Sequence, residues 1–216
     1  MARDDSPDAW RAAAGGLAAY RLAFAAGIVL VVGVLVQVMV SGNRVSWGVE
    51  VAALLVDIAK SLAELGGAVW LAARTPRGAV AATLAAIAYG VVAACGLIGL
   101  VCKVVAADSW SALVASTASS VAGVVCVALA CAAVGRALGN ADIVRRGHHF
   151  VASVAVLGVG LAILYQLADD TGVVVVMFLL GLYALVQVAA YIMLLGFTID
   201  AMRAHAPLPP RAEIAR

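Results

Sequence analysis

Six long apolar runs limit what this chain can fold into. An α-helix needs about 20 mostly apolar residues to cross a hydrocarbon core about 30 Å thick, and each run is about that long or longer. The runs cover residues 22–40, 49–73, 79–105, 112–134, 150–168 and 173–199. Backbone groups inside a bilayer must be satisfied within the protein, which a helix does within one segment. We therefore predict an all-α polytopic membrane protein, a bundle of six transmembrane helices.

The composition indicates that lipid is the solvent for most of the chain. Hydrophobic residues make up 65% of the 216 residues and charged residues only 12%, whereas a soluble domain is about half apolar and about a quarter charged. Such a chain cannot cover a water-facing surface with polar groups. The low charge also argues against a nucleic-acid-binding protein, which needs a basic patch. The expected partner is the lipid bilayer, and no nucleic acid is expected.

The positions of proline and tryptophan agree with the predicted ends of the six spans. Every proline lies outside the six runs, where a helix tolerates or needs a break: Pro7, Pro76, Pro207, Pro209 and Pro210. The four tryptophans lie near the ends of runs: Trp10, Trp47, Trp70 and Trp110. Tryptophan is enriched at the level of the lipid headgroups, so these positions predict the same span ends.

Basic residues predict the orientation. One side of the predicted membrane gathers most of the arginines: Arg3, Arg11, Arg21, Arg74, Arg77, Arg136, Arg145, Arg146, Arg203, Arg211 and Arg216. The other side carries Arg44 and Lys103 together with acidic residues: Glu50, Asp108, Asp169 and Asp170. Because Lys and Arg favour the cytoplasmic side, both termini are predicted there, which requires an even number of spans. Heavy use of Ala, Val, Gly, Leu and Arg is typical of GC-rich bacterial genomes, so we expect the bacterial cytoplasmic (inner) membrane.

The chain divides into three predicted parts: a cytoplasmic N-terminal segment at 1–21, a six-helix transmembrane domain at 22–200 and a cytoplasmic tail at 201–216. Ser6, Pro7 and Asp8 are typical of a helix start, with a capping Ser, Pro in the first position and an acid in the first turn. Two interpretations of residues 7–20 follow. The segment is either a helix lying in the cytoplasmic interface or an extension of the first span.

The second run carries a group of charges. Asp57, Lys60 and Glu64 fall within about 60° of arc, because each residue of a helix turns by about 100°. Glu50 and Ser61 share that face. The opposite side is apolar: Val51, Leu55, Ile58, Leu62, Leu65 and Val69. A helix with two such faces is expected to turn its charged face away from lipid and toward other helices.

Depth makes these charges costly. Lys60 is predicted near the middle of the span, with Asp57 a turn toward the outer surface and Glu64 a turn toward the inner one. A charge at the bilayer centre costs roughly 2.5–3.5 kcal/mol. Lys60 can pair with Asp57 at i−3 and with Glu64 at i+4, which neutralises one carboxylate and leaves the other in surplus. The surplus acid must be protonated, solvated or paired with another helix.

Depth also predicts partners for this face. In the sixth run Gln187 lies near the middle, with Tyr183 and Tyr191 one turn to either side. In the fourth run, small residues reach the depth of Asp57: Ser116, Ser119, Ser120 and Gly123. By depth, Arg21 could reach Glu64, and Lys103 could reach Glu50. The predicted intramembrane polar site comprises Asp57, Lys60, Glu64, Ser119, Ser120, Tyr183, Gln187 and Tyr191.

Two functions fit this charged face. One is a path for an ion, a proton or a polar solute, since intramembrane ionisable residues often mark such paths. The other is a non-catalytic accessory or assembly subunit of a membrane complex, in which the same charges dock a partner and give specificity. A water-filled cavity that reaches Lys60 favours the first, and a dry, fully paired network favours the second. We expect a homo-oligomer or a larger membrane complex, because a six-span chain this small often needs partners to enclose a path.

No motif indicates an enzyme. The sequence contains no Ser-His-Asp arrangement, HExxH motif, phosphate loop or dinucleotide fingerprint. The cysteines lie in apolar runs without a CxxC pair and are expected to pack as small hydrophobes: Cys95, Cys102, Cys126 and Cys131. His148 and His149 follow two arginines and predict a basic cluster at the interface that contacts anionic lipid, with metal binding or pH sensing as the alternative. We predict no catalytic residue, cofactor or metal.

Overall fold

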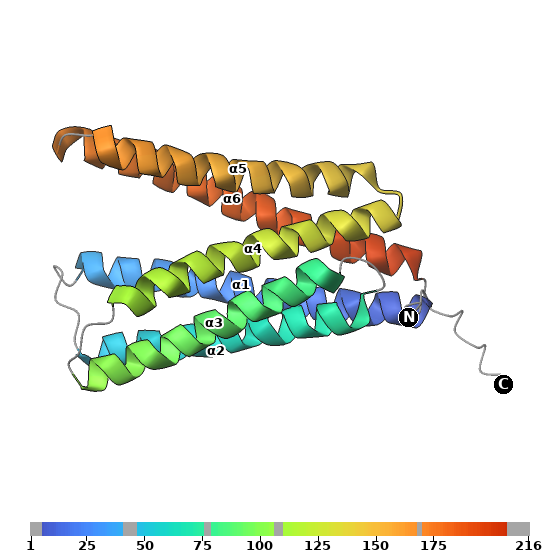
Figure 1. Ribbon diagram of the computed structural model, residues 1–216, viewed down its shortest axis with the longest axis horizontal. Coiled ribbons are helices and arrows are strands. Elements are labelled where there is room, and N and C mark those ends of the chain that lie inside the picture. The colour runs from blue at the N-terminus through green and yellow to red at the C-terminus, as the bar shows by residue number, and fades with distance from the viewer. Residues whose placement is uncertain (1–5, 41–46, 76–78, 106–109, 168–169, 207–216) are drawn as a thin grey trace.

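The computed structural model describes residues 6–40, 47–75, 79–105, 110–167 and 170–206, and this part of the chain is almost entirely helical (Figure 1). It contains six helices: α1 (Pro7–Val40), α2 (Trp47–Arg74), α3 (Ala79–Val104), α4 (Trp110–Ala137), α5 (Ala141–Leu167) and α6 (Asp170–His205). The predicted all-α helical bundle is therefore confirmed. At about 1.5 Å per residue, each helix is longer than the thickness of a hydrocarbon core.

The helices run up and down, and each packs against the next one in the sequence (Figure 1). α6 returns to pack against α1, which closes the ring, and α4 also contacts α6. One end of the bundle, here called the terminal end, holds the start of α1, the end of α6 and the α2–α3 and α4–α5 connections. The opposite end is called the distal end. Both described chain ends therefore lie at the same end of the bundle.

Four segments of these helices are long and apolar enough to cross a membrane: Pro7–Val29, Ala79–Val104, Ala115–Ala137 and Gly181–His205. They belong to α1, α3, α4 and α6, and they indicate that the protein is embedded in a membrane. α2 carries Asp57, Lys60 and Glu64 within two turns, so its composition differs from that of these segments. α5 begins with Asp142, Arg145 and Arg146, which lower its mean hydropathy.

Residues 7–20 continue into the first apolar run as one unbroken helix. Their side chains pack within the bundle. The Trp10 ring lies edge-on to the His205 ring with centroids 5.7 Å apart, and Arg11 Nε donates to the Ala206 carbonyl at 3.2 Å. From α2, Trp70 Nε1 donates to the Ala12 carbonyl at 2.8 Å. These contacts tie the start of α1 to the ends of α2 and α6.

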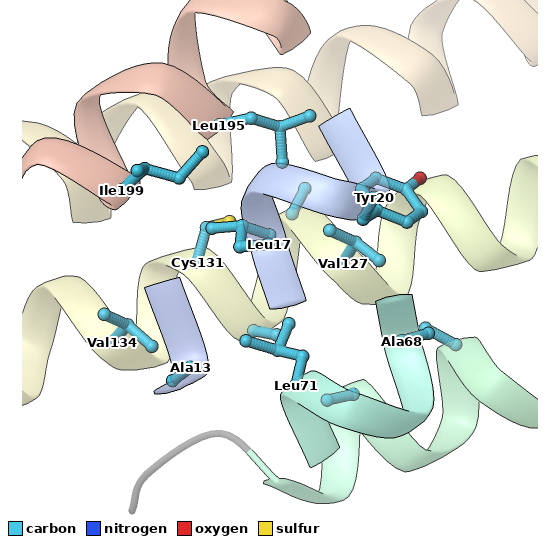
Figure 2. Packing of buried hydrophobic residues seen from close by; sticks show 14 of the residues in the cluster. Ala13, Leu17, Tyr20, Ala68, Leu71, Val127, Cys131, Val134, Leu195 and Ile199 are labelled. Atoms are coloured by element: carbon cyan, nitrogen blue, oxygen red, sulfur yellow. The ribbon is translucent and has the colours of Figure 1, made fainter. Parts of the chain in front are cut away.

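The buried core lies in the terminal half of the bundle (Figure 2). Large buried side chains come from the terminal halves of all six helices: Leu17, Leu71, Val92, Val134, Ile143, Leu195, Ile199 and Met202. Exposed apolar side chains occur along the outside of the whole bundle, for example Val69, Val80 and Ile87 in the terminal half. In the distal halves they include Val32, Val36, Val121, Val156, Val159, Leu185 and Val186. Figure 1 shows the α5–α6 pair diverging from α1–α4 toward the distal end. In a membrane protein, such exposed apolar side chains suit contact with lipid.

Close helix approach in the core depends on glycine. An added Cβ at Gly67 of α2 would lie 2.8 Å from Tyr20 Cβ and 3.0 Å from Tyr20 Cα, so α1 would have to move. The α4–α5 hairpin turns at Gly139, whose φ of 68° favours glycine. Asn140 then caps α5 by accepting a hydrogen bond from the Ile143 amide at 3.2 Å.

The neighbouring glycines Gly66 and Gly67 provide a matched test of the α1–α2 contact. Gly67→Ala should destabilise the protein by about 1–3 kcal/mol, because the added methyl group overpacks the interface. Gly66 has no heavy atom within 4 Å of an added Cβ, so Gly66→Ala should be neutral or stabilising by up to about 1 kcal/mol through helix propensity. Thermal unfolding in detergent measures both. Equal shifts for the two variants would contradict the close packing of α1 on α2.

Candidate functional site

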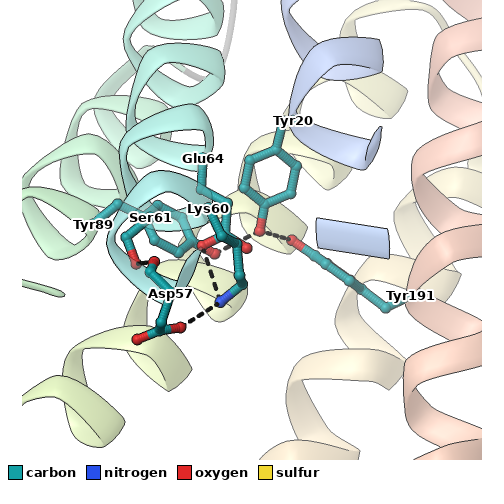
Figure 3. Close-up of polar contacts among 7 residues, drawn as sticks. All are labelled: Tyr20, Asp57, Lys60, Ser61, Glu64, Tyr89 and Tyr191. Atoms are coloured by element: carbon teal, nitrogen blue, oxygen red, sulfur yellow. Dashed lines mark hydrogen bonds and ion pairs between the residues drawn. The ribbon is translucent and has the colours of Figure 1, made fainter. Parts of the chain in front are cut away.

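Three tyrosine hydroxyls meet inside the bundle (Figure 3). Tyr20 of α1 stands in the centre, and its hydroxyl is hydrogen-bonded to Tyr89 of α3 and, at an oxygen–oxygen distance of 2.9 Å, to Tyr191 of α6. All three side chains are at most 1% exposed. A buried tyrosine hydroxyl needs a partner, and here each hydroxyl supplies one for another. This tyrosine triad links three helices through their polar tips.

The ionisable residues of α2 extend from this triad toward the distal end. The Glu64 carboxyl lies beside it (Figure 3). Lys60 Nζ lies 3.6 Å from Glu64 Oε2 and 3.8 Å from Asp57 Oδ1. The side chains of Asp57, Lys60 and Glu64 are 52%, 21% and 2% exposed. Accessibility therefore falls step by step from the accessible carboxylate to the buried one.

The Lys60 ammonium is shared between the two carboxylates. Direct charge-assisted hydrogen bonds to carboxylates are about 2.7–2.9 Å long, so both distances are those of loose ion pairs. The nearly equal separations show that the ammonium lies between Asp57 and Glu64 and is bound tightly to neither. One cation thus faces two acids, and the site has an excess of carboxylate.

Glycines of neighbouring helices make room for this site. An added Cβ at Gly27 of α1 would clash with Cδ and Cε of Lys60, so the lysine stem lies directly on the α1 backbone. An added Cβ at Gly123 of α4 would lie 2.7 Å from Cζ of Tyr89, so the tyrosine ring occupies the space that a larger residue would fill. The absence of a side chain at these two positions allows Lys60 and Tyr89 to occupy their observed positions.

Ser61 is buried on the same face of α2, but its hydroxyl is used locally. Its Oγ donates to the Asp57 carbonyl of the preceding turn at 2.8 Å. Such a bond satisfies the hydroxyl inside its own helix. Ser61 therefore fills space beside Glu64.

The structure brings together some of the site residues expected from sequence and separates others. Asp57, Lys60, Glu64 and Tyr191 lie in one connected cluster. The remaining members lie nearer the distal end: Gln187, Ser119 and Ser120 are half-buried and Tyr183 is exposed. They make no described contact with the tyrosine triad.

Two other predicted partners of the charged face have different surroundings. The Arg21 guanidinium lies against Gly196 of α6, where an added Cβ would be 3.2 Å from Nη1, and it forms no described ion pair with Glu64. Lys103 is exposed at the distal end of α3. The side chain of its proposed partner, Glu50, lies outside the described residues.

Sequence reasoning missed Tyr20 and Tyr89, although depth could have indicated both. Glu64 lies ten residues before the end of α2, and Tyr89 lies ten residues after the start of α3. Antiparallel helices joined by a short connection reach equal depth at equal distance from it. Tyr20 and Tyr191 are similarly matched, thirteen residues into α1 and fourteen before the end of α6. Buried tyrosines at the depth of a buried acid were therefore a detectable signal.

The site offers carboxyl, ammonium and hydroxyl groups. Among the described residues, no group of three or more His, Cys, Asp or Glu side chains lies close enough together to hold a metal ion. His148 and His149 are exposed near the start of α5, at the terminal end. Comparisons with protein families, curated proteins and solved structures give no match.

The triad predicts an order of stability among tyrosine variants. Tyr20→Phe removes the central hydroxyl and leaves Tyr89 and Tyr191 without their described partner, whereas Tyr191→Phe leaves the bond between Tyr20 and Tyr89 intact. A buried polar group left unsatisfied costs about 1–3 kcal/mol, so Tyr20→Phe should lower stability more. Thermal unfolding in one detergent measures the order.

The exposed Tyr183 supplies the control for hydroxyl removal, and Tyr183→Phe should leave stability nearly unchanged. A smaller loss for Tyr20→Phe than for Tyr191→Phe would contradict the central position of Tyr20.

Proposed function

We propose that this protein transports or conducts a small ion or proton across a membrane, with Asp57, Lys60 and Glu64 as its intramembrane site. The observation that carries the proposal is the fall in side-chain exposure from 52% at Asp57 through 21% at Lys60 to 2% at Glu64. Ionisable groups within a membrane are costly, and they commonly mark ion or proton paths. A graded series of such groups supports an entry that leads from an accessible carboxylate to a buried one.

The charge balance favours a positively charged substrate. With both acids ionised, two carboxylates surround one ammonium, and the net charge of the site is −1. An arriving proton or cation would compensate the surplus charge. Because Lys60 is held loosely between the acids, it can pair fully with one acid when the other receives the substrate.

Accessibility on one side only also supports transport. The polar groups approach the surface toward the distal end, while an apolar layer separates the triad from the terminal end (Figure 2). This layer includes Leu17, Leu71, Val134 and Ile199, all at most 4% exposed. Such an arrangement suits a transporter or gated channel in a state open to one side, in which apolar side chains form the closed gate.

The proposal includes six membrane spans with both termini in the cytoplasm of a bacterium. It is supported by the even number of described helices, by four segments apolar enough to span and by the arginines near the terminal end. In this arrangement α2 and α5 cross the bilayer as members of the bundle. The site then lies within the hydrocarbon region.

Reporter fusions test this topology. A fluorescent protein fused after Arg216 should fluoresce, because such proteins mature in the cytoplasm, and alkaline phosphatase fused after Asn43 should be active in the periplasm. The opposite pattern of activities would contradict N-in, C-in topology. Equal phosphatase activity after Asn43 and after Asn140 would contradict the three membrane crossings proposed between these two positions, because an odd number of crossings puts them on opposite sides.

Flux measurements test the transport function. Purified protein in liposomes should carry H⁺, Na⁺ or K⁺ under an imposed potential, and Asp57→Asn with Glu64→Gln should reduce that flux to the level of empty liposomes. Asp200→Asn is the matched control, because Asp200 is an exposed acid near the end of α6 and outside the site. Unchanged flux in the double variant would reject the transport proposal.

An accessory or assembly role is the second candidate, and the exposure of Asp57 favours it. Half of this side chain is accessible, and its ion pair with Lys60 is long at 3.8 Å. A cation of another subunit, or of a second copy of this chain, could complete the pair at an interface. Loss of a co-purifying membrane protein or of the oligomer in Asp57→Asn, with no flux in the unmodified protein, would select this role.

A further inference from the structure

We infer that the transported species is a proton, and that the Tyr20 hydroxyl relays it between Glu64 and Tyr191. This inference rests on the proposed transport function and names its substrate. It is carried by the direct hydroxyl contacts of the tyrosine triad beside a buried carboxyl group (Figure 3). The transfers between tyrosines follow from their hydroxyl contacts, and the first transfer follows from the position of the buried Glu64 carboxyl beside them.

The spacing of the hydroxyls favours a proton over a larger ion. The Tyr20 oxygen lies 2.9 Å from that of Tyr191 and also bonds directly to that of Tyr89. Oxygens in direct hydrogen-bonding contact leave no space for a cation or water molecule between them. A proton passes along such contacts by exchange of O–H bonds, whereas Na⁺ or K⁺ would require the rings to separate.

The number of hydrogens gives the triad an open end. Three hydroxyls carry three hydrogens, and only two are used in the bonds that Tyr20 makes with its two neighbours. The third hydrogen points away from the chain. Either oxygen can be the donor in each bond. The hydrogen bonds of the triad can therefore all point toward Tyr191 or all point toward Tyr89. A chain of reversible orientation can receive a proton at one end and release one at the other.

Glu64 is placed to load this chain. Its carboxyl is 2% exposed and lies beside the hydroxyls of the triad (Figure 3). In transfer, the carboxyl O–H bond breaks as a hydroxyl oxygen of Tyr89 or Tyr20 gains the proton. That hydroxyl gives up its own hydrogen to the next oxygen, and Tyr191 releases one to a water molecule that is admitted when the apolar layer opens toward the terminal end.

The transfer leaves every tyrosine with one hydrogen, so the net change is one proton moved from Glu64 past Tyr191. No group is oxidised or reduced. Lys60 stabilises the remaining Glu64 carboxylate from 3.6 Å, and when Glu64 is protonated the same ammonium can turn to Asp57. Rotation of the three hydroxyls restores the starting orientation.

Aromatic packing keeps the exit of the relay rigid and dry. The Tyr191 ring contacts Phe24 edge-on, with centroids 4.9 Å apart, and stacks on Phe150, with centroids 4.8 Å apart. Tyr191 itself is fully buried. These two contacts hold the ring while its hydroxyl bonds to Tyr20, and in this state the apolar surroundings exclude the water that a hydrated metal ion would bring.

Proteoliposomes loaded with a pH-sensitive dye test the relay. A potassium gradient with valinomycin sets the membrane potential that drives proton entry. In a parallel experiment, Na⁺ entry is measured under an imposed sodium gradient, and the two fluxes are compared. We expect proton flux in the unmodified protein, slower flux in deuterated water and loss of flux in Tyr20→Phe. Thr83→Val, which removes an exposed hydroxyl from α3, should keep the full flux.

Each outcome separates the relay from the transport function. Loss of flux in Glu64→Gln with normal proton flux in Tyr20→Phe would overturn the relay and leave the transport proposal standing. Flux of Na⁺ or K⁺ without proton flux would overturn the proton assignment. If Tyr20→Phe does not fold, Tyr191→Phe, which keeps the bond between Tyr20 and Tyr89, tests the same relay. Normal proton flux in that variant would also overturn the relay.

Discussion

Charged groups are costly to bury away from water, and this constraint shapes how α2 packs in the bundle. Its acids and lysine are accommodated by graded burial rather than by one tight ion pair. Glu64 is enclosed beside hydroxyls, the Lys60 stem is covered by α1 at Gly27, and Asp57 keeps half its surface accessible. On the side toward α3, Ile58 packs closely on Gly96. These contacts together set the rotation of α2 about its own axis.

The tyrosine triad extends the same constraint to three other helices. Tyr20, Tyr89 and Tyr191 come from α1, α3 and α6, so their hydrogen bonds join helices that do not follow one another in the chain. A hydrogen bond in surroundings of low dielectric is strong when satisfied and costly when broken. A slide of any one helix by a turn would separate these hydroxyls. The triad therefore fixes the relative depth of the helices, while the glycines fix how closely they approach.

The positions of the helices along the chain could be predicted from the sequence because the lengths of the apolar runs indicate them. The rotation of each helix could not, because small residues cover most of its surface. Arg21 illustrates this: once Tyr20 turns toward Tyr89, the next side chain lies about 100° away and meets α6 at Gly196. Tyr20 was missed because the predicted membrane domain began at residue 22, whereas α1 is continuous from Pro7. Gln187 lies one turn before Tyr191 in α6 and is half-buried, but no described hydrogen bond joins it to the triad.

The one-sided distribution of the core has a mechanical consequence. Side chains interlock in the terminal half, whereas the distal halves of α5 and α6 expose most of their described apolar groups. Segments with few buried contacts open at a lower free energy than a packed core. The packed core therefore holds the helices together at the terminal end. The α4–α5 hairpin with Gly139 lies at that end. A change of packing at that end would alter how far the distal halves of α5 and α6 stand from the other helices.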